Sequence, residues 1–263
     1  YALLPTAGYV LPAALCEALY QRCGNRLSYI QADIDAVSHD AGRWCCYSKA
    51  EHISSSAGLV MATNIPLSFI ADDDMAWLDI DRVGGQSVSV VADRCSSSRI
   101  QRVVNAGSYI TPEHDGLHHV GASYRADGTP VSGVDDTETA GLLDAFRTYV
   151  VAPGDYQAES VWVGERGIAR DRMPVIGACP DADFFQRCYS DIAKGDARKR
   201  YPAAALRRGL YLSLGHGSRG FSTSYFAAEI IASLLCGDPL PVTVPVKNLV
   251  SAARLLIRTL KGS

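Results

Sequence analysis

The sequence predicts a mixed α/β fold in which α/β elements flank an antiparallel sheet, and three observations predict it. Helical and strand patterns alternate along the chain without internal repeats. The strand patterns in the middle of the chain are short and separated by turn residues, which is typical of antiparallel sheets. With 263 residues and 48% hydrophobic content, the chain can bury a substantial core as one large domain or two interleaved ones.

The first part of the chain predicts one helix and three strands. Proline suits a first helical position, and apolar residues recur at helical spacing over residues 12–23, so a helix is expected there, ended by Gly24 and Asn25. Strands are expected over 27–34, 44–48 and 59–62. The last of these is an apolar run, which is typical of a buried strand.

The middle of the chain predicts the antiparallel sheet and a second helix. Strands are expected over 87–93, 101–112 and 117–124. A helix is expected over 137–150, with Thr137 as its cap, Leu142, Leu143 and Phe146 on one face, and Pro153-Gly154 closing it. His118 and His119 are adjacent on a strand and should point to opposite faces, which argues against a paired metal site.

Residues 210–241 predict a strand, a glycine turn and a helix. Gly215, Gly217 and Gly220 spell G-x-G-x-x-G, but too little chain follows to supply the further βαβ units that a dinucleotide-binding crevice requires. The helix should end at Gly237, and its core-facing residues should be Phe226, Ala227, Ile230, Ile231, Leu234 and Leu235. Ser222, Thr223 or Ser224 is expected to cap it, and its first turn offers free N–H groups to an electron-rich ligand.

The charge is divided unequally along the chain. Residues 1–193 hold 14 basic and 25 acidic side chains, a net charge of −11, whereas residues 194–263 hold 11 and 3, a net charge of +8. The basic side chains of this second part include Lys194, Arg198, Lys199, Arg200, Arg207, Arg208, Arg254, Arg258 and Lys261. Two interpretations stay open: such a cluster can follow a nucleic-acid phosphate backbone, or it can form a solvated loop and helix face.

Composition argues against several classes of protein. The eight cysteines show neither C-x-x-C pairs nor histidine partners at metal-ligand spacing, so we expect free thiols in a reducing cytoplasm and no metal site. No run of apolar residues is long enough to span a membrane, and the beginning of the sequence does not have the pattern of a signal peptide. We therefore expect a cytoplasmic protein without a membrane partner.

Three strings, in chain order, carry a resemblance to a known family. They are I-T-P-E-H-D-G-L-H-H-V-G-A-S-Y at 110–124, D-R-M-P-V-I-G at 171–177 and L-G-H-G-S-R-G-F at 214–221. On these strings and on GYVLPAALCEAL and GLVMATN before them, the chain resembles, nearly end to end, the FAD-dependent amine oxidoreductases of the D-amino-acid-oxidase and glycine-oxidase superfamily. The first string favours the branch whose bifunctional bacterial members modify the tRNA wobble uridine.

The resemblance implies an arrangement of domains. Residues 1–75 would be a remnant of a doubly wound FAD-binding domain and residues 161–240 its C-terminal part, interleaved with an antiparallel-sheet substrate domain at 76–160 and followed by a tail helix at 241–263. In the family, a dinucleotide-binding segment precedes these parts, and the tRNA branch carries a methyltransferase domain before that. We therefore expect a C-terminal fragment or a truncated form that, in isolation, retains FAD weakly or not at all.

The resemblance also implies the site residues. The turn would meet the pyrimidine edge of the flavin, with the dipole of the following helix stabilising negative charge there. Arg166 would grip a substrate carboxylate bidentately, and Tyr109 and Tyr124 would face the substrate. The implied FAD contacts are Ala62, Thr63, Gly215, His216, Gly217, Ser218, Arg219, Gly220, Phe221 and Ser222. Without the resemblance, Arg166 would be interpreted as an ion-pair partner of Asp171 or a surface residue, and the tyrosines as half-buried sheet aromatics.

The implied reaction is oxidative removal of the carboxymethyl group from 5-carboxymethylaminomethyl-(2-thio)uridine at the tRNA wobble position, which yields the aminomethyl uridine and glyoxylate. Two alternatives stay open: an oxidase of glycine, sarcosine or D-amino acids, and a non-catalytic RNA-binding fragment. One departure bears on the substrate, because Gly84-Gly85-Gln86 stands where the tRNA branch usually has R-G-Q. We expect Gln86 still to contribute a side-chain contact near the cleft.

Overall fold

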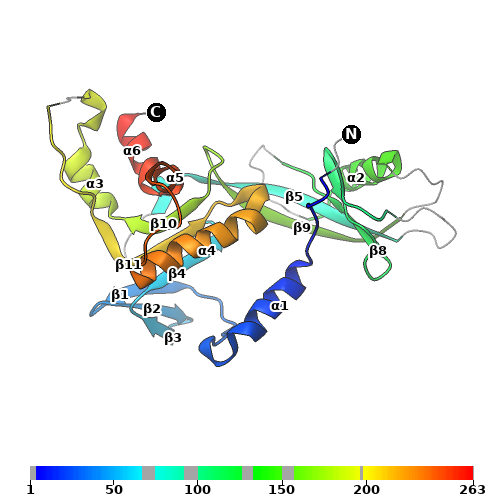
Figure 1. Cartoon of the computed structure of the whole chain (residues 1–263), viewed down its shortest axis with the longest axis horizontal. Helices are drawn as coiled ribbons and strands as arrows, with labels where there is room; N and C mark the ends of the chain where they lie inside the picture. The colour runs from blue at the N-terminus through cyan, green and yellow to red at the C-terminus, as the bar shows by residue number, and fades with distance from the viewer. Residues whose placement is uncertain are drawn as a thin grey trace. The chain divides into compact units, whose positions relative to one another are not determined.

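The chain divides into two compact units, each made of two stretches of sequence. The structure, a computed structural model, describes residues 4–66, 75–91, 100–125, 133–149, 157–195 and 198–262. Unit 1 comprises Tyr1–Gln31 and Val83–Glu165, and unit 2 comprises Ala32–Arg82 and Arg166–Ser263. Figure 1 labels the main helices and strands of both units.

Unit 1 is built on the predicted antiparallel sheet, whose strands follow the order β6-β7-β8-β5-β9. These strands are β5 (Ile80–Val91), β6 (Val104–Ala106), β7 (Ser108–Ile110), β8 (Leu117–Gly121) and β9 (Gln157–Ala169), and the unit also holds helices α1 (Pro12–Cys23) and α2 (Asp136–Tyr149) and the 3-10 turn η1 (Gly24–Arg26). β5 and β9 each extend across the boundary between the units.

One face of the unit 1 sheet is buried and the other is open. Alternate residues of a strand point to opposite faces, and Val88, Val90, Ile110 and Val120 form a cluster with Leu142 and Phe146 of α2. His118 lies on the buried side with 1% of its surface exposed, whereas its neighbour His119 is half-buried. The prediction that these histidines point to opposite faces is confirmed.

Unit 2 holds two three-stranded sheets and the C-terminal helices. One sheet is the antiparallel meander of β1 (Ala36–Asp40), β2 (Arg43–Ser48) and β3 (Glu51–Ser56). The other has the order β10-β11-β4 and contains β4 (Leu59–Asn64), β10 (Val175–Pro180) and β11 (Leu206–Leu214), with β11 parallel to β4. The helices are α3 (Ala182–Tyr189), α4 (Gly220–Cys236), α5 (Val244–Val250) and α6 (Ala253–Lys261), with 3-10 turns η2 (Met75–Leu78), η3 (Ile192–Lys194) and η4 (Gly217–Arg219).

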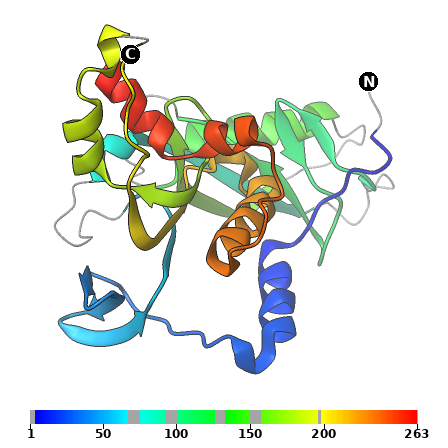
Figure 2. The ribbon, with the colours of Figure 1, turned by 60° about the vertical axis from the view of Figure 1, so that its left-hand side comes forward.

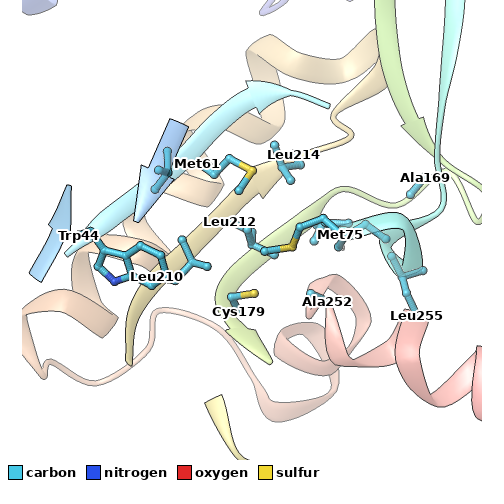
Figure 3. Close-up of a cluster of buried hydrophobic side chains, with 13 residues drawn as sticks. Trp44, Met61, Met75, Ala169, Cys179, Leu210, Leu212, Leu214, Ala252 and Leu255 are labelled. Atoms are coloured by element: carbon cyan, nitrogen blue, oxygen red, sulfur yellow. The ribbon is translucent and has the colours of Figure 1, made fainter. Parts of the chain in front are cut away.

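The β10-β11-β4 sheet is covered on both faces, as in a doubly wound domain. Helix α4 lies along one face, where Ile176 packs with Ala227, Ile230 and Ile231 (Figures 1 and 2). The opposite face carries Leu210, Leu212 and Leu214 of β11. These side chains are fully buried with Trp44, Met61, Met75, Cys179, Ala252 and Leu255, all of which are labelled in Figure 3.

Most of the predicted elements are found, and the helix over residues 12–23 has the predicted bounds. The strand predicted over 27–34 is wrong: the segment has no regular secondary structure and pairs with no described strand, and Tyr29 is 73% exposed. The strand predicted over 101–112 is a hairpin instead, because Gly107 turns the chain between β6 and β7 at a φ of 84°. The structure also contains β1 and β3, which the sequence patterns did not predict.

The structure also corrects the predicted caps and core-facing residues of the helices. Thr137 does not cap α2, because the carboxylate of Asp135 accepts the N–H groups of Thr137 and Glu138 at 2.8 and 3.0 Å. Leu235 does not face the core, since it is 50% exposed on α4, whereas Gly237 ends that helix as predicted. The end predicted for the 87–93 strand and the Pro153-Gly154 stop lie outside the described residues.

Candidate active site

The turn between β11 and α4 is held where the ends of three strands of unit 2 meet. The N–H of Gly215 donates to the carbonyl oxygen of Asn64 at the end of β4, at 3.0 Å. The side-chain oxygen of Asn64 accepts the N–H of Gly167 in β9 at 2.7 Å, and Ile168 of β9 forms a bridge with His216. β4, β9 and β11 therefore fix the backbone of the turn from both sides.

Glycine is required at the crowded positions of this arrangement. Gly215 and Gly217 have φ values of 63° and 57°, in the left-handed region that side chains disfavour. A Cβ atom on Gly167 would lie 2.2 Å from the carbonyl oxygen of Asn64. Asn64 itself has a φ of 68°, a conformation that asparagine tolerates better than most residues.

Helix α4 begins at Gly220 without a side-chain cap. The prediction that Ser222, Thr223 or Ser224 caps it is wrong: the Thr223 hydroxyl donates to the carbonyl of Arg219 at 2.9 Å, and that of Ser224 to the carbonyl of Phe221 at 3.2 Å. Hydroxyls that donate to carbonyls inside the helix do not satisfy the first-turn N–H groups. The first-turn N–H groups of α4 can therefore bind an electron-rich partner. The side chains of the surrounding residues Ser218, Arg219, Phe221 and Ser222 are exposed.

His216 is held as a neutral imidazole inside the turn. Its Nδ1 lies 2.7 Å from the Thr223 hydroxyl and its Nε2 lies 2.9 Å from the Ser213 hydroxyl. Because the Thr223 hydrogen is already donated to Arg219, Nδ1–H donates to Thr223, and Nε2 accepts from Ser213. Burial lowers the pKa of His216 below its usual value, and the interaction with Ser213 offsets only part of this effect.

The end of β4 lies directly beside the turn. Leu214 is the register partner of Asn64, so Ala62 and Thr63, both exposed, are within two residues of the point where the turn starts. The Thr63 hydroxyl donates to the carbonyl of Ile65 at 2.6 Å. Asn64 was missed as a site residue, although an asparagine directly after an apolar run is a signal of a left-handed strand end.

Arg166 lies on β9, two residues before Ile168. Residues two apart on a strand share one face, and Ile168 lies 3.3 Å from the point where a Cβ atom on Gly217 would stand. Arg166, which is half-buried, therefore projects from the same face of β9 as the residue that packs on the turn. It does not pair with Asp171, whose carboxylate binds Arg254 at 2.8 and 3.0 Å and Arg258 at 3.2 Å.

Tyr109 and Tyr124 belong to unit 1. Tyr109 is 40% exposed on the open face of the sheet, and its hydroxyl oxygen lies 2.7 Å from where a Cβ atom on Gly121 would stand. Its ring therefore crosses Gly121, its partner on β8, which has no side chain to displace it. Tyr124 is 48% exposed, just after β8. Both tyrosines are thus accessible sheet aromatics.

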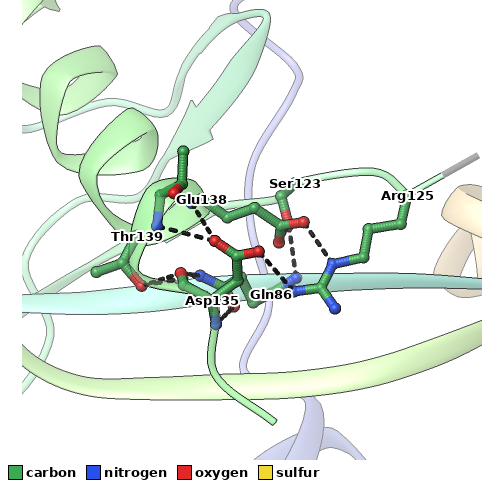
Figure 4. A network of polar contacts seen from close by, with 7 residues as sticks. Gln86, Ser123, Arg125, Asp135, Glu138 and Thr139 are labelled. Carbon is green, nitrogen blue, oxygen red and sulfur yellow. Dashed lines mark hydrogen bonds and ion pairs between the residues drawn. The ribbon is translucent and has the colours of Figure 1, made fainter. Parts of the chain in front are cut away.

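Gln86 has a structural role, so the prediction that it contacts the cleft is wrong. Its side chain is fully buried and binds both backbone groups of Asp135, donating to the carbonyl at 2.8 Å and accepting from the N–H at 3.0 Å (Figure 4). It also donates to Thr139 at 2.8 Å. Around it, Ser123 and Arg125 donate to the two oxygens of Glu138. The network fastens the beginning of α2 to the sheet.

In the described ranges, no three His, Cys, Asp or Glu side chains are grouped so that they could hold a metal ion. The same ranges contain no helix that is both long and apolar enough to cross a membrane.

Comparisons with known proteins agree on one family. A family model described as "DAO: FAD dependent oxidoreductase" matches residues 2–234. The tRNA 5-methylaminomethyl-2-thiouridine biosynthesis bifunctional protein of Shewanella loihica is 31% identical over 278 residues, which cover 97% of this chain and 39% of that protein. Its counterpart in Shewanella putrefaciens is 28% identical with the same coverage. The chain thus spans about two fifths of the length of these curated relatives.

Solved structures establish the fold. Glycine oxidase from Geobacillus kaustophilus superimposes with a TM-score of 0.57 at 20% identity, over 84% of this chain and 52% of that one. L-proline dehydrogenase from P. horikoshii does so with a TM-score of 0.56 at 16% identity, over 88% of this chain and 54% of that one. The predicted mixed α/β class with an antiparallel sheet is confirmed.

Proposed function

We propose, from the premise that the chain belongs to the family of FAD-dependent oxidoreductases, that it is the oxidoreductase part of an enzyme acting on the tRNA wobble uridine. The proposed reaction converts 5-carboxymethylaminomethyl-(2-thio)uridine into the aminomethyl uridine and glyoxylate. The tRNA-modifying relatives, whose similarity extends over 97% of the chain, support this choice of substrate. A methyltransferase domain elsewhere in the same polypeptide is the proposed partner.

The observation that carries the proposal is the turn at residues 215–222. It leads into the uncapped start of α4, where Ser218, Arg219, Phe221 and Ser222 are exposed, and its position is fixed by β4 and β9. Free N–H groups and the positive end of a helix dipole suit the electron-rich edge of a flavin. These residues fit the cofactor of the family: Gly215–Ser222 would hold the pyrimidine edge, and Ala62 and Thr63 would lie beside it.

When bound, FAD supplies the acceptor for the hydride that leaves the carbon next to the substrate nitrogen. The residues of the chain bind and orient the substrate. We assign the substrate carboxylate to Arg166, because a guanidinium grips a carboxylate bidentately and so fixes the glycyl carbon. Tyr109 and Tyr124 are proposed as substrate contacts. Loss of hydride and the amine proton leaves an imine, and water then splits it into the aminomethyl uridine and glyoxylate.

His216 has a positioning role in this proposal. Burial lowers its pKa, which favours the neutral imidazole, and both ring nitrogens are engaged by hydroxyls, so neither is available to take a proton from the substrate. The substrate needs only an unprotonated amine. His216 instead joins the end of β11 to the first turn of α4 through Ser213 and Thr223.

The test is to mix the FAD-containing complete protein anaerobically with tRNA that carries the carboxymethylaminomethyl uridine. Loss of the oxidised flavin absorbance together with one equivalent of glyoxylate is the expected result. Glycine and sarcosine serve as matched small substrates. Rapid flavin reduction by either of them, and none by the modified tRNA, would contradict the proposal in favour of a small-molecule amine oxidase.

A further inference from the structure

A hollow of about 340 Å³ lies in unit 2 beside the C-terminal helix α6. Its lining comes from three parts of the chain: Trp77 and Asp79 in and after η2, Arg170 after β9, and Leu255, Arg258, Thr259 and Gly262 on and after α6. None of these residues belongs to the site described above. The volume is within the usual range for binding sites of small organic groups.

The lining combines a flat apolar wall with positive charge. Trp77 and Leu255 supply the apolar surface, and the guanidinium groups of Arg170 and Arg258 supply the charge. Arg170 is 73% exposed, and its contact with Asp79 is long, at 3.9 Å. Arg258 shares the carboxylate of Asp171 with Arg254 and remains 37% exposed. With Arg254 and Asp171 included, three arginines stand against two carboxylates, and this excess of one positive charge beside Trp77 favours an anionic ligand with a planar group.

Further basic residues lie on the elements that surround the hollow. α3, η2 and η3 all contact α6, and their apolar residues form a common cluster with Leu256 (Figures 1 and 2). The exposed basic residues on these elements and on the segment after η3 include Lys194, Arg200 and Lys261, with Lys199 paired to Asp191. Arg254 does not contribute, because it is only 12% exposed and anchors α6 to Asp171.

The hollow is lined partly by residues that lie beyond the family match. The family model ends at residue 234, before α5 and α6. The similarity to the tRNA-modifying relatives covers 97% of the chain, so it includes most of the segment beyond that point. The lining residues Leu255, Arg258, Thr259 and Gly262 lie beyond the family match, whereas Trp77, Asp79 and Arg170 lie within it.

We infer that this surface of unit 2 binds the RNA substrate, with the hollow taking one unstacked nucleotide whose base packs on Trp77 and whose phosphate pairs with Arg170 and Arg258. Proteins bind single-stranded RNA by stacking bases on aromatic side chains and pairing phosphates with basic ones. The inference rests on the proposed function, because it presumes a tRNA substrate.

The test measures binding of tRNA to the complete protein over a range of salt concentrations, for wild type, Arg170→Gln and Arg170→Gln with Arg258→Gln. Arg208→Gln, in an exposed arginine of β11 outside the hollow, is the matched control. We expect Kd to rise about tenfold in the double variant, with the slope of log Kd against log salt reduced by about 1 for each lost phosphate contact. An equal effect of Arg208→Gln, or no effect of Arg170→Gln alone, would overturn the inference.

Two further arms make the outcome specific. Adenosine monophosphate tests whether the hollow takes a free nucleotide instead; binding of the nucleotide in the micromolar range without Arg170-dependent RNA binding would overturn the inference. The free modified nucleoside reports on the proposed function, because it needs the flavin site but not this surface. Flavin reduction by the nucleoside with RNA binding unaffected in Arg170→Gln would overturn the RNA surface alone. Failure of both nucleoside and tRNA to reduce the flavin would overturn the proposed function, while the binding arm still decides the surface.

Discussion

The two units organise their polar groups in opposite ways. In unit 2, the candidate flavin turn is made of backbone, and glycines and one asparagine let three strand ends approach each other closely. In unit 1, a buried side chain, Gln86, ties the start of α2 to the sheet and leaves the face with Tyr109 open. Backbone geometry thus forms the proposed cofactor site of unit 2, whereas side-chain hydrogen bonds in unit 1 fasten α2 to the sheet that carries Tyr109.

The largest effect is expected where backbone approaches backbone in unit 2. Gly167→Ala places a Cβ atom 2.2 Å from the Asn64 carbonyl oxygen, so the backbone of β9 or that of β4 must move. We expect a loss of about 3–5 kcal/mol in the free energy of unfolding, measured by denaturant titration. Gly141→Ala in α2 is the control: nothing lies within 4 Å of the added atom, and replacing an exposed helical glycine should stabilise by about 0.5–1 kcal/mol. Equal midpoints for the two variants would contradict the crowding.

The next effect tests the side-chain network of unit 1. Gln86→Leu leaves the N–H of Asp135 without its acceptor, whereas the Asp135 carbonyl still accepts the N–H and the hydroxyl of Thr139. We expect a loss of about 1–3 kcal/mol, the cost of one unsatisfied buried group. Gln101→Leu, at an exposed position of the same unit, should change stability by no more than about 0.5 kcal/mol. A Gln86→Leu protein as stable as wild type would show that the network contributes nothing.

The dependence of stability on acidic pH tests the comparison through Asp171 in unit 2. Burial raises its pKa, but the hydrogen bonds from Arg254 and the N–H of Met173 and the charges of Arg254 and Arg258 outweigh this and lower the pKa below 3.8. The carboxylate therefore contributes stability that is present above pH 4 or so and is lost as the pH falls through the lowered pKa. Asp171→Asn should reduce stability at pH 7 and flatten this acid dependence in thermal melts. An unchanged slope below pH 4 would contradict the assignment.

The smallest effect comes from His216. Its pKa is lowered by burial, so the unfolded chain takes up its proton first as the pH falls below about 6.5. Stability should therefore decline from pH 6.5 towards the lowered folded pKa, and His216→Gln should remove that part of the decline. Melting temperatures of the two proteins at pH 7.5 and 5.5 measure it. An identical pH dependence would show that the imidazole is not held neutral.

The same contrast explains what the sequence predicted. Glycines at 215, 217 and 220 and the apolar run of β11 predicted the strand, turn and helix, because left-handed backbone and helix periodicity leave direct marks in sequence. The family was predicted from the strings around these residues, and the fold class from the alternation of helical and strand patterns. Gln86, Asp135 and the α4 start were misjudged, because which polar atom meets which N–H depends on contacts between distant segments. Residues 27–34 have a strand-like pattern, but β structure also requires a partner strand, which local sequence does not reveal.

The central claim is that Arg166 orients a substrate carboxylate for a flavin held by the 215–222 turn. The most direct measurement is anaerobic stopped-flow reduction of the flavin by the modified nucleoside in the complete protein, for wild type, Arg166→Ala and the exposed neighbour Arg172→Ala. We expect flavin content to be unchanged in all three, and the substrate Kd to rise about tenfold to a hundredfold in Arg166→Ala only, as loss of a charge-assisted hydrogen bond of about 1.5–3 kcal/mol implies. Reduction of the Arg166→Ala flavin with the wild-type rate and Kd would contradict the claim.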